Sequence, residues 1–155
     1  MDQNGVELRV APAVGTARVG KGRAPEAAPT WVGAVARVEL TVTDADTAQA
    51  VGSGDVPVLA TPRVVALVEA ASVAATATRL APGSTTVGTR VDLEHRAATA
   101  VGRTVVAEAH LAKAEGRRLE FEVVVRDGAT VVAEGRVERV LVDRHSFVAK
   151  AFGAA

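Results

Sequence analysis

The 155-residue chain has no cysteine and no tyrosine, and it carries one tryptophan and three phenylalanines. Without cysteine, disulfides, thiolate metal sites and a cysteine nucleophile are excluded. Because aromatic residues make up only 3% of the chain, the core has to be built from valine, leucine and alanine. These small side chains each bury little apolar area, which favours further burial at a subunit interface.

The chain also lacks an excess of either charge, because 18 basic and 18 acidic residues cancel. This balance gives no electrostatic reason to expect a nucleic-acid or membrane partner. No apolar run reaches the roughly 18 residues of a membrane span. The first residues, MDQNGVELRV, do not have the pattern of a signal peptide. We therefore expect a cytoplasmic protein.

Composition divides the chain into three parts. Residues 1–30 are rich in alanine, glycine and proline, which predicts a flexible extension with a short strand near residues 6–10. Residues 31–150 have regular hydrophobic patterns and fit one compact domain. We expect residues 151–155 to form a short tail.

The segment LATPRVVALVEAASVAATATRL, residues 59–80, predicts one long helix. Thr61 stands where an N-cap belongs, and Pro62 stands where the first helical residue belongs. Between Arg63 and Arg79 every residue except Glu69 is apolar, serine or threonine. A helix of this kind is expected to be enclosed on most sides. An unpaired buried charge is costly, so Glu69 needs a partner or a function.

Alternating apolar and polar residues predict one strand before this helix, at residues 36–42, and four after it, at residues 87–95, 105–111, 119–125 and 131–141. Asp127 and Gly128 indicate a tight hairpin. The segment 44–58 is expected to be a loop or lid with one helical turn capped by Asp44 or Asp46. The order predicts an α+β fold in which an antiparallel sheet wraps one long buried helix. Edge strands of such a sheet favour a homodimer.

Three polar residues break the pattern around them. Glu69 lies in the apolar helix, His95 follows Val91 and Leu93 on the apolar face of its strand, and Arg139 lies between two apolar positions of the last strand. Each has a structural explanation: an interface ion pair, a hydrogen-bonded core histidine and an arginine that reaches solvent. Together they could satisfy one another and supply acid–base chemistry. No spacing resembles a set of metal ligands, so no metal is predicted.

The segments ATPRVVALVEAASV, VGTRVDLEHRAAT, EGRRLEFEVVVRDG and VERVLVDRHSFVAK resemble hot-dog-fold thioesterases, most closely the fluoroacetyl-CoA thioesterase type. The resemblance covers residues 32–150. It implies a homodimeric hydrolase that needs no cofactor and acts on a short-chain acyl-CoA thioester, halogenated acyl groups included. It also implies catalytic roles for Thr61, Glu69 and His95, with Gly88 and Arg139 binding the substrate.

In this resemblance Glu69 would be the general base toward water, or a nucleophile that forms a transient anhydride. Thr61 and Glu69 are eight residues apart, which is ~12 Å along a straight helix. Either the start of the helix bends, or a partner subunit completes the site, and we favour the shared site. Exposed arginines could reach the CoA phosphates; they are Arg90, Arg96, Arg117 and Arg118.

The resemblance has one departure. The fluoroacetyl-specific enzyme has an aromatic-rich lid before the helix, whereas DADTAQAVGSGDVPV contains no aromatic residue. This argues against fluoroacetyl selectivity and leaves a short acyl thioester as the expected substrate. Two alternatives stay open. One is a hot-dog enzyme that acts on acyl-carrier-protein thioesters or on enoyl-CoA, and the other is a non-catalytic protein that binds an acyl thioester or another small ligand.

Overall fold

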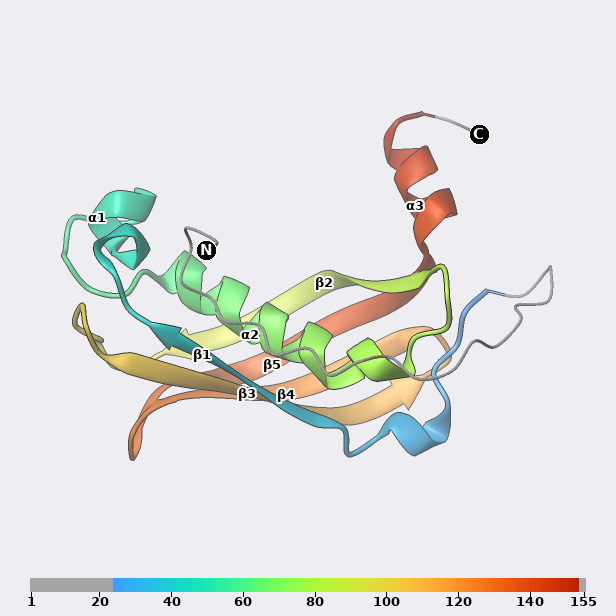
Figure 1. Cartoon of the computed structure of the whole chain (residues 1–155), viewed down its shortest axis with the longest axis horizontal. Helices are drawn as coiled ribbons and strands as arrows, with labels where there is room; N and C mark the ends of the chain where they lie inside the picture. The colour runs from blue at the N-terminus through green and yellow to red at the C-terminus, as the bar shows by residue number, and fades with distance from the viewer. Residues whose placement is uncertain (1–23, 154–155) are drawn as a thin grey trace.

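The computed structural model describes residues 24–153, and the strand predicted near residues 6–10 lies outside this range. Five antiparallel strands form one curved sheet, with a long helix along one face (Figure 1). Their order across the sheet is β1-β3-β4-β5-β2, which leaves β1 and β2 at the edges. The predicted α+β class is therefore confirmed. The strands are β1 Val35–Thr41, β2 Ser84–His95, β3 Thr104–Glu115, β4 Arg118–Asp127 and β5 Thr130–Asp143.

Helix α2, Thr61–Thr76, supplies one half of the core and continues into a 3₁₀ turn, Ala77–Arg79. Its inner face packs against the sheet, and each large buried side chain contributes about 1.5–3 kcal/mol to folding. The buried residues of α2 are Val64, Leu67, Val68, Ala71, Ser72, Ala75 and Thr76. The outer face differs from the prediction of an enclosed helix, because Ala66 and Val73 are exposed. One sheet covers only one side of a helix, so a single chain leaves the other side open.

The segment between β1 and α2 contains a 3₁₀ turn, Asp44–Asp46, and a short helix α1, Ala48–Val51. The helical turn was predicted, but the predicted cap, Asp44 or Asp46, is wrong, because Thr43 is the N-cap of the 3₁₀ turn and Thr47 that of α1. Thr47 accepts a hydrogen bond from the Ala50 N–H and caps α1. The Asp46 carboxylate instead accepts from the N–H and hydroxyl of Thr43, at 2.8 and 2.9 Å, and from Arg63 at 2.9 Å. The segment is therefore fastened to the start of α2.

Strand β2 contains a bulge at Thr89, because Gly88 pairs with Arg139 while Arg90 pairs with Glu138. The extra residue reverses the alternation of side chains along the strand. Thr86 and Gly88 face α2 before the bulge, and His95 lies on this face after it. The predicted strand is confirmed, but its uninterrupted alternation over residues 87–95 is wrong.

Both ends of the described chain attach to the sheet. Near the N-terminus, the Ala27 N–H donates to the Gly116 carbonyl at 2.8 Å. At the other end helix α3, Arg144–Ala151, follows β5 and is capped by Asp143, whose carboxylate accepts from the Ser146 N–H. Helix α3 projects away from the sheet, beyond the β2 edge (Figure 1). Within residues 24–153, no helix has the length and apolar character needed to span a bilayer.

Candidate active site

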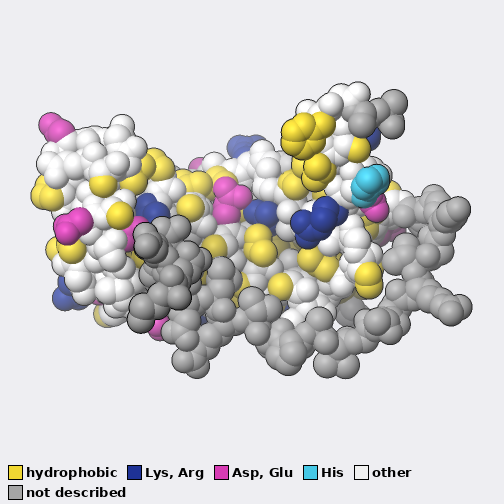
Figure 2. Space-filling model, turned by 45° about the horizontal axis from the view of Figure 1, so that its top comes forward, with side chains coloured by type: hydrophobic (Ala, Val, Ile, Leu, Met, Phe, Trp, Pro, Cys, Tyr) yellow, Lys and Arg dark blue, Asp and Glu magenta, His cyan; other side chains and the backbone are white. Residues whose placement is uncertain are grey.

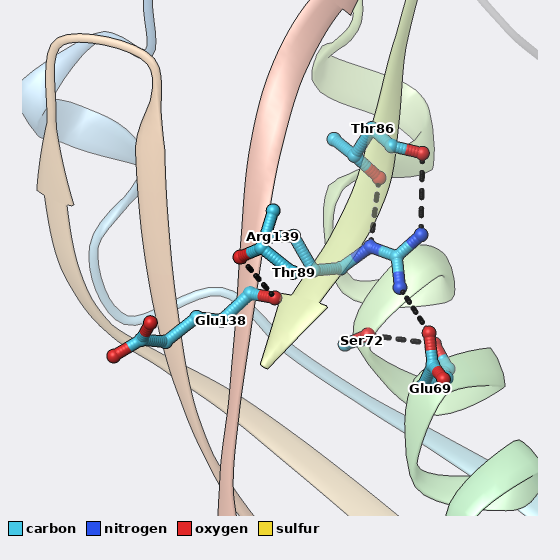
Figure 3. A network of polar contacts seen from close by, with 6 residues as sticks. All are labelled: Glu69, Ser72, Thr86, Thr89, Glu138 and Arg139. Atoms are coloured by element: carbon cyan, nitrogen blue, oxygen red, sulfur yellow. Dashed lines mark hydrogen bonds and ion pairs between the residues drawn. The ribbon is translucent and has the colours of Figure 1, made fainter. Parts of the chain in front are cut away.

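Arg139 of β5 is the centre of a buried polar network beneath α2 (Figure 3). Its side chain is 7% exposed. Its Nε donates to the Thr86 hydroxyl at 2.9 Å, and one Nη donates to the Thr86 carbonyl at 3.2 Å. The other Nη donates to the Glu69 carboxylate at 3.0 Å. Burial lowers the pKa of Arg139 and the Glu69 carboxylate opposes this, so the guanidinium stays charged near neutral pH.

Glu69 projects from the middle of α2 and keeps partial access to solvent, with 36% of its side chain exposed. One carboxylate oxygen accepts from Arg139. Among residues 24–153, the other oxygen has no hydrogen-bond partner. Arg139 of β5 thus neutralises the charge of Glu69 in the apolar helix. The second carboxylate oxygen of Glu69 stays available to accept a proton from water.

Gly88 lies directly beneath this carboxylate. A Cβ atom at Gly88 would collide with the Glu69 carboxylate and would lie 3.2 Å from the Arg139 guanidinium. Gly88 is not among the glycines with positive φ, so the position requires space rather than an unusual backbone conformation. The structure therefore brings together three of the five site residues predicted from the sequence: Glu69, Gly88 and Arg139.

The other two, Thr61 and His95, meet at the start of α2. The Thr61 hydroxyl and the His95 Nδ1 are 2.7 Å apart, and the histidine tautomer decides which of them donates. The predicted capping role of Thr61 is wrong, because Ala60 is the N-cap and the hydroxyl of Thr61 is used by the imidazole. The His95 Nε2 is buried and has no hydrogen-bond partner in the described part of the chain. A buried nitrogen without a partner can serve a ligand.

The pair lines a pocket of about 320 Å³ between the segment before α2 and the end of β2. Its walls are small or aliphatic, and no aromatic side chain is among its lining residues, which are Ala48, Ser53, Gly54, Asp55, Val56, Val58, Leu59, Thr61, His95, Arg96, Ala97 and Ala98. This volume is sufficient for a small acyl group.

The two clusters are separate within one chain. Eight helical residues place Thr61 ~12 Å from Glu69 along α2. No hydrogen bond or ion pair between described residues joins Glu69 to His95. Sequence reasoning missed Thr86, whose hydroxyl and carbonyl orient Arg139. Hydrophobic alternation could not have identified it, because the Thr89 bulge changes which residues of β2 face the helix and is not visible in the pattern.

The four arginines considered for CoA binding have different environments. Arg96 is held by Glu94 and Glu134, at 2.8 and 2.7 Å. Arg90 and Arg118 line a pocket of about 390 Å³ together with Lys113. This pocket also contains three glutamates, so its charge is mixed. The structure brings two of the four arginines together.

Comparison with known proteins fits this geometry. The family described as fluoroacetyl-CoA-specific thioesterase matches residues 42–145. The chain belongs to this family. The fluoroacetyl-CoA thioesterase of Streptantibioticus cattleyicolor is 41% identical over 93 residues, which cover 60% of this chain and 67% of that protein. The thioesterase resemblance inferred from the sequence is thereby confirmed.

Solved structures support the same conclusion. A fluoroacetyl-CoA thioesterase structure has a TM-score of 0.75 and 32% identity, covering 80% of this chain and 96% of that one. Variants of that enzyme have been solved with acetyl-CoA and with fluoroacetate and CoA. A hot-dog-like protein from Thermanaerovibrio acidaminovorans has a TM-score of 0.72 at 22% identity, covering 79% and 90% of the two chains. The predicted hot-dog fold is confirmed.

Proposed function

We propose that this protein hydrolyses short-chain acyl-CoA thioesters to a carboxylate and free CoA. The observation that carries the proposal is the Glu69 carboxylate, which Arg139 holds by one oxygen while the other has no partner within residues 24–153. The pocket of about 320 Å³ at Thr61 and His95 provides space for a small acyl group. Its lining residues include no aromatic side chain, so we expect little preference for fluoroacetyl over acetyl.

The proposed active unit is a homodimer joined through β2. This strand has twelve residues and lies at an edge of the sheet, where unpaired backbone groups can pair with a second copy. Antiparallel pairing centred on Asp92, with Thr89 and Arg90 of the bulge counted as one position, would place the partner's His95 opposite Gly88. Within one strand these positions are seven residues apart, ~23 Å, whereas paired strands lie ~4.8 Å apart. The dimer would therefore bring Glu69 to the partner's Thr61 and His95.

In this shared site Glu69 acts as the general base. It removes a proton from a water molecule as the water oxygen attacks the thioester carbonyl carbon, and the carbon–sulfur bond then breaks. Arg139 positions the carboxylate. The partner's Thr61 holds the imidazole through Nδ1, so that the Nε2 of the partner's His95 can hydrogen-bond the acyl oxygen or pass a proton to the departing thiolate. Direct attack by Glu69 would instead form an anhydride, which water then hydrolyses.

The test is a series of acyl-CoAs, from acetyl and haloacetyl to longer chains, with released thiol as the readout. Because the chain contains no cysteine, the protein itself gives no thiol background. We expect the highest kcat/KM for the shortest acyl groups, with fluoroacetyl and acetyl within about tenfold of each other.

Three results would change the assignment. Tight acyl-CoA binding without thiol release would indicate a binding protein. Thiol release only from acyl-carrier-protein substrates would show that the substrate's thiol carrier is the carrier protein and not CoA. Hydration of enoyl-CoA without loss of CoA would identify a hydratase. The cytoplasmic location expected from the sequence stays a prediction, which imaging of the tagged protein would test.

A further inference from the structure

Helix α3 presents apolar side chains that the rest of the described chain does not cover. None of its eight residues is buried. Phe147 is 44% exposed, and Phe152, directly after the helix, is 85% exposed. These are two of the three phenylalanines in the chain, and the third, Phe121, is in the core. The family match ends at residue 145, so α3 lies almost wholly beyond it.

The start of α3 is fixed beside the free edge of the sheet. The Arg144 N–H donates to the Gly83 carbonyl at 2.9 Å, and Ser84, the first residue of β2, pairs with Asp143. From this point the helix extends past β2 instead of folding back on its own sheet (Figure 1). The helix thus lies on the side of the β2 edge that a second copy, paired through β2, would occupy.

A complementary surface lies at the other end of the molecule, on residues 43–58. Val51 and Val56 are exposed there, and Val56 lines the pocket of Thr61 and His95. The segment contains three aspartates and no basic residue, whereas α3 contains Arg144, His145 and Lys150 and no acidic residue. Figure 2 shows raised ends over α1 and α3, both with hydrophobic side chains, and a hollow between them.

Within one chain these surfaces cannot meet, because α1 and α3 lie near opposite ends of α2 (Figure 1). The sixteen residues of α2 span ~24 Å. Antiparallel pairing of β2 with its copy reverses the direction of one chain. In the register proposed above, Ser84 would oppose Thr99 of the partner subunit, and α3 would lie beside the partner's residues 53–59.

We propose that α3 docks on residues 43–58 of a second copy of this chain, where Phe147 closes the pocket of Thr61 and His95. This inference rests on the proposed thioesterase function and its β2-paired dimer. Two-fold symmetry makes the contact reciprocal, so each dimer has two such docked helices and two closed pockets.

Cysteine cross-linking of the full chain tests the docking independently of catalysis. The natural chain has no cysteine, so every disulfide formed comes from the introduced residues. A disulfide requires Cα atoms about 4.4–6.8 Å apart. Four double variants pair Val51→Cys or Val56→Cys with Phe147→Cys or Val148→Cys. We expect at least one to form a covalent dimer under mild oxidation, and the corresponding mixture of single variants to form a covalent heterodimer.

The matched control combines Phe147→Cys with Val35→Cys, an exposed valine on the β1 edge. This control and each single variant alone should remain monomeric on a non-reducing gel. Failure of all four double variants to cross-link would overturn the docking. Equal cross-linking of the Val35 control would overturn it as well, because the reaction would then reflect random collision.

Acyl selectivity tests the closure of the pocket. Phe147→Ala should raise kcat/KM for hexanoyl-CoA relative to acetyl-CoA by about tenfold, because the pocket loses a wall. Val35→Ala should leave this ratio unchanged. An unchanged ratio in Phe147→Ala would overturn the closing role. Cross-linking of the variants together with no thiol release by the natural chain would reject only the thioesterase function, whereas thiol release by the natural chain without any cross-link in the variants would reject only the docking.

Discussion

The two polar clusters along α2 differ in how completely their hydrogen bonds are satisfied. In the cluster of Glu69 and Arg139, the guanidinium donates to three oxygens, and Thr86 supplies two of them. In the cluster of Thr61 and His95, a single contact joins the pair, and the buried Nε2 has no partner within residues 24–153. The guanidinium of the first cluster is thus satisfied within one chain, whereas the second cluster has a buried nitrogen that a ligand could bind.

This difference indicates different tasks for the two clusters. A buried guanidinium with three acceptors holds its neighbour in one geometry, which suits positioning of a carboxylate base. A buried imidazole nitrogen without a partner is unfavourable unless substrate or water completes it. We therefore assign proton removal to the middle of α2 and binding of the acyl oxygen or thiolate to its start.

Removing the base should have the largest effect. Glu69→Gln keeps the shape and hydrogen-bonding capacity of the side chain but cannot take a proton from water. We expect kcat to fall by about 10²-fold or more, with unchanged circular dichroism and melting temperature. Steady-state thiol release measures the loss. Turnover near that of the natural protein would show that Glu69 is not the catalytic base, and the two clusters would then not differ in task.

Displacing the base should have the next largest effect. Gly88→Ala places a methyl group against the Glu69 carboxylate, so we expect kcat to fall by about tenfold or more and stability to change by about 1–3 kcal/mol. Gly135 is not a suitable control, because a Cβ there would meet the backbone of β2. Gly54 lines the pocket of Thr61 and His95, so Val35→Ala, at an exposed position of the β1 edge, is the better control. Full activity of Gly88→Ala would contradict the close approach.

Removing the Thr61 hydroxyl, which contacts His95 at the start of α2, should lower activity by a smaller factor. Thr61→Val removes the hydroxyl at nearly constant volume, and we expect kcat/KM to fall by about tenfold. Thr61→Ser keeps the hydroxyl and should retain most of the activity. A pH–rate profile of both variants checks whether the hydroxyl acts through His95. A loss of activity in Thr61→Ser but not in Thr61→Val would indicate that the methyl group, and not the hydroxyl, matters.

The smallest effect concerns the fastening of residues 43–58. Burial alone would raise the pKa of Asp46, but hydrogen bonds from Thr43 and Arg63 outweigh it and hold this pKa below its usual value. The folded pKa is depressed, so the stabilisation is fully present above about pH 4 and is lost as the pH falls through the folded pKa. Asp46→Asn should lower the free energy of unfolding by about 1–2 kcal/mol at pH 7.

Urea titrations at several pH values measure this difference. It should begin to shrink below about pH 4 and approach zero once the pH is below the folded pKa of Asp46, because both proteins then carry a neutral side chain at this position. A difference that is independent of pH would mean that the hydrogen-bond geometry, rather than the charge of Asp46, stabilises the segment.

Most of the fold was predictable because it follows from alternation. The inward positions of β3 and β4, such as Leu111 and Phe121, are buried as their pattern predicts. The pattern failed at the Thr89 bulge, because an extra residue in one strand has no signature in hydrophobic alternation. It also failed for the outer face of α2, where Val73 is apolar and yet exposed in the single chain.

The site was only partly predictable. The alternation of apolar and polar residues identified His95 and Arg139 as polar residues on apolar faces, and the resemblance added Thr61 and Gly88. The sequence did not indicate which of these side chains contact each other. In the structure Glu69 pairs with Arg139, and His95 pairs with Thr61. Likewise the hydroxyl of Thr61, expected to cap the helix, contacts His95 instead, because an N-terminal hydroxyl can bond either to its own helix or to a neighbouring strand.

The fastening of residues 43–58 has a kinetic consequence. Asp46 ties this segment to Arg63, and its far end pairs with the turn before β3 through Val58 and Ala100. Because residues 43–58 are held at both ends, we expect this wall of the pocket to stay in place when a substrate enters. We therefore expect slow hydrogen exchange in this wall and faster exchange in α3, which makes the terminal helix, rather than the loop, the moving gate of the pocket.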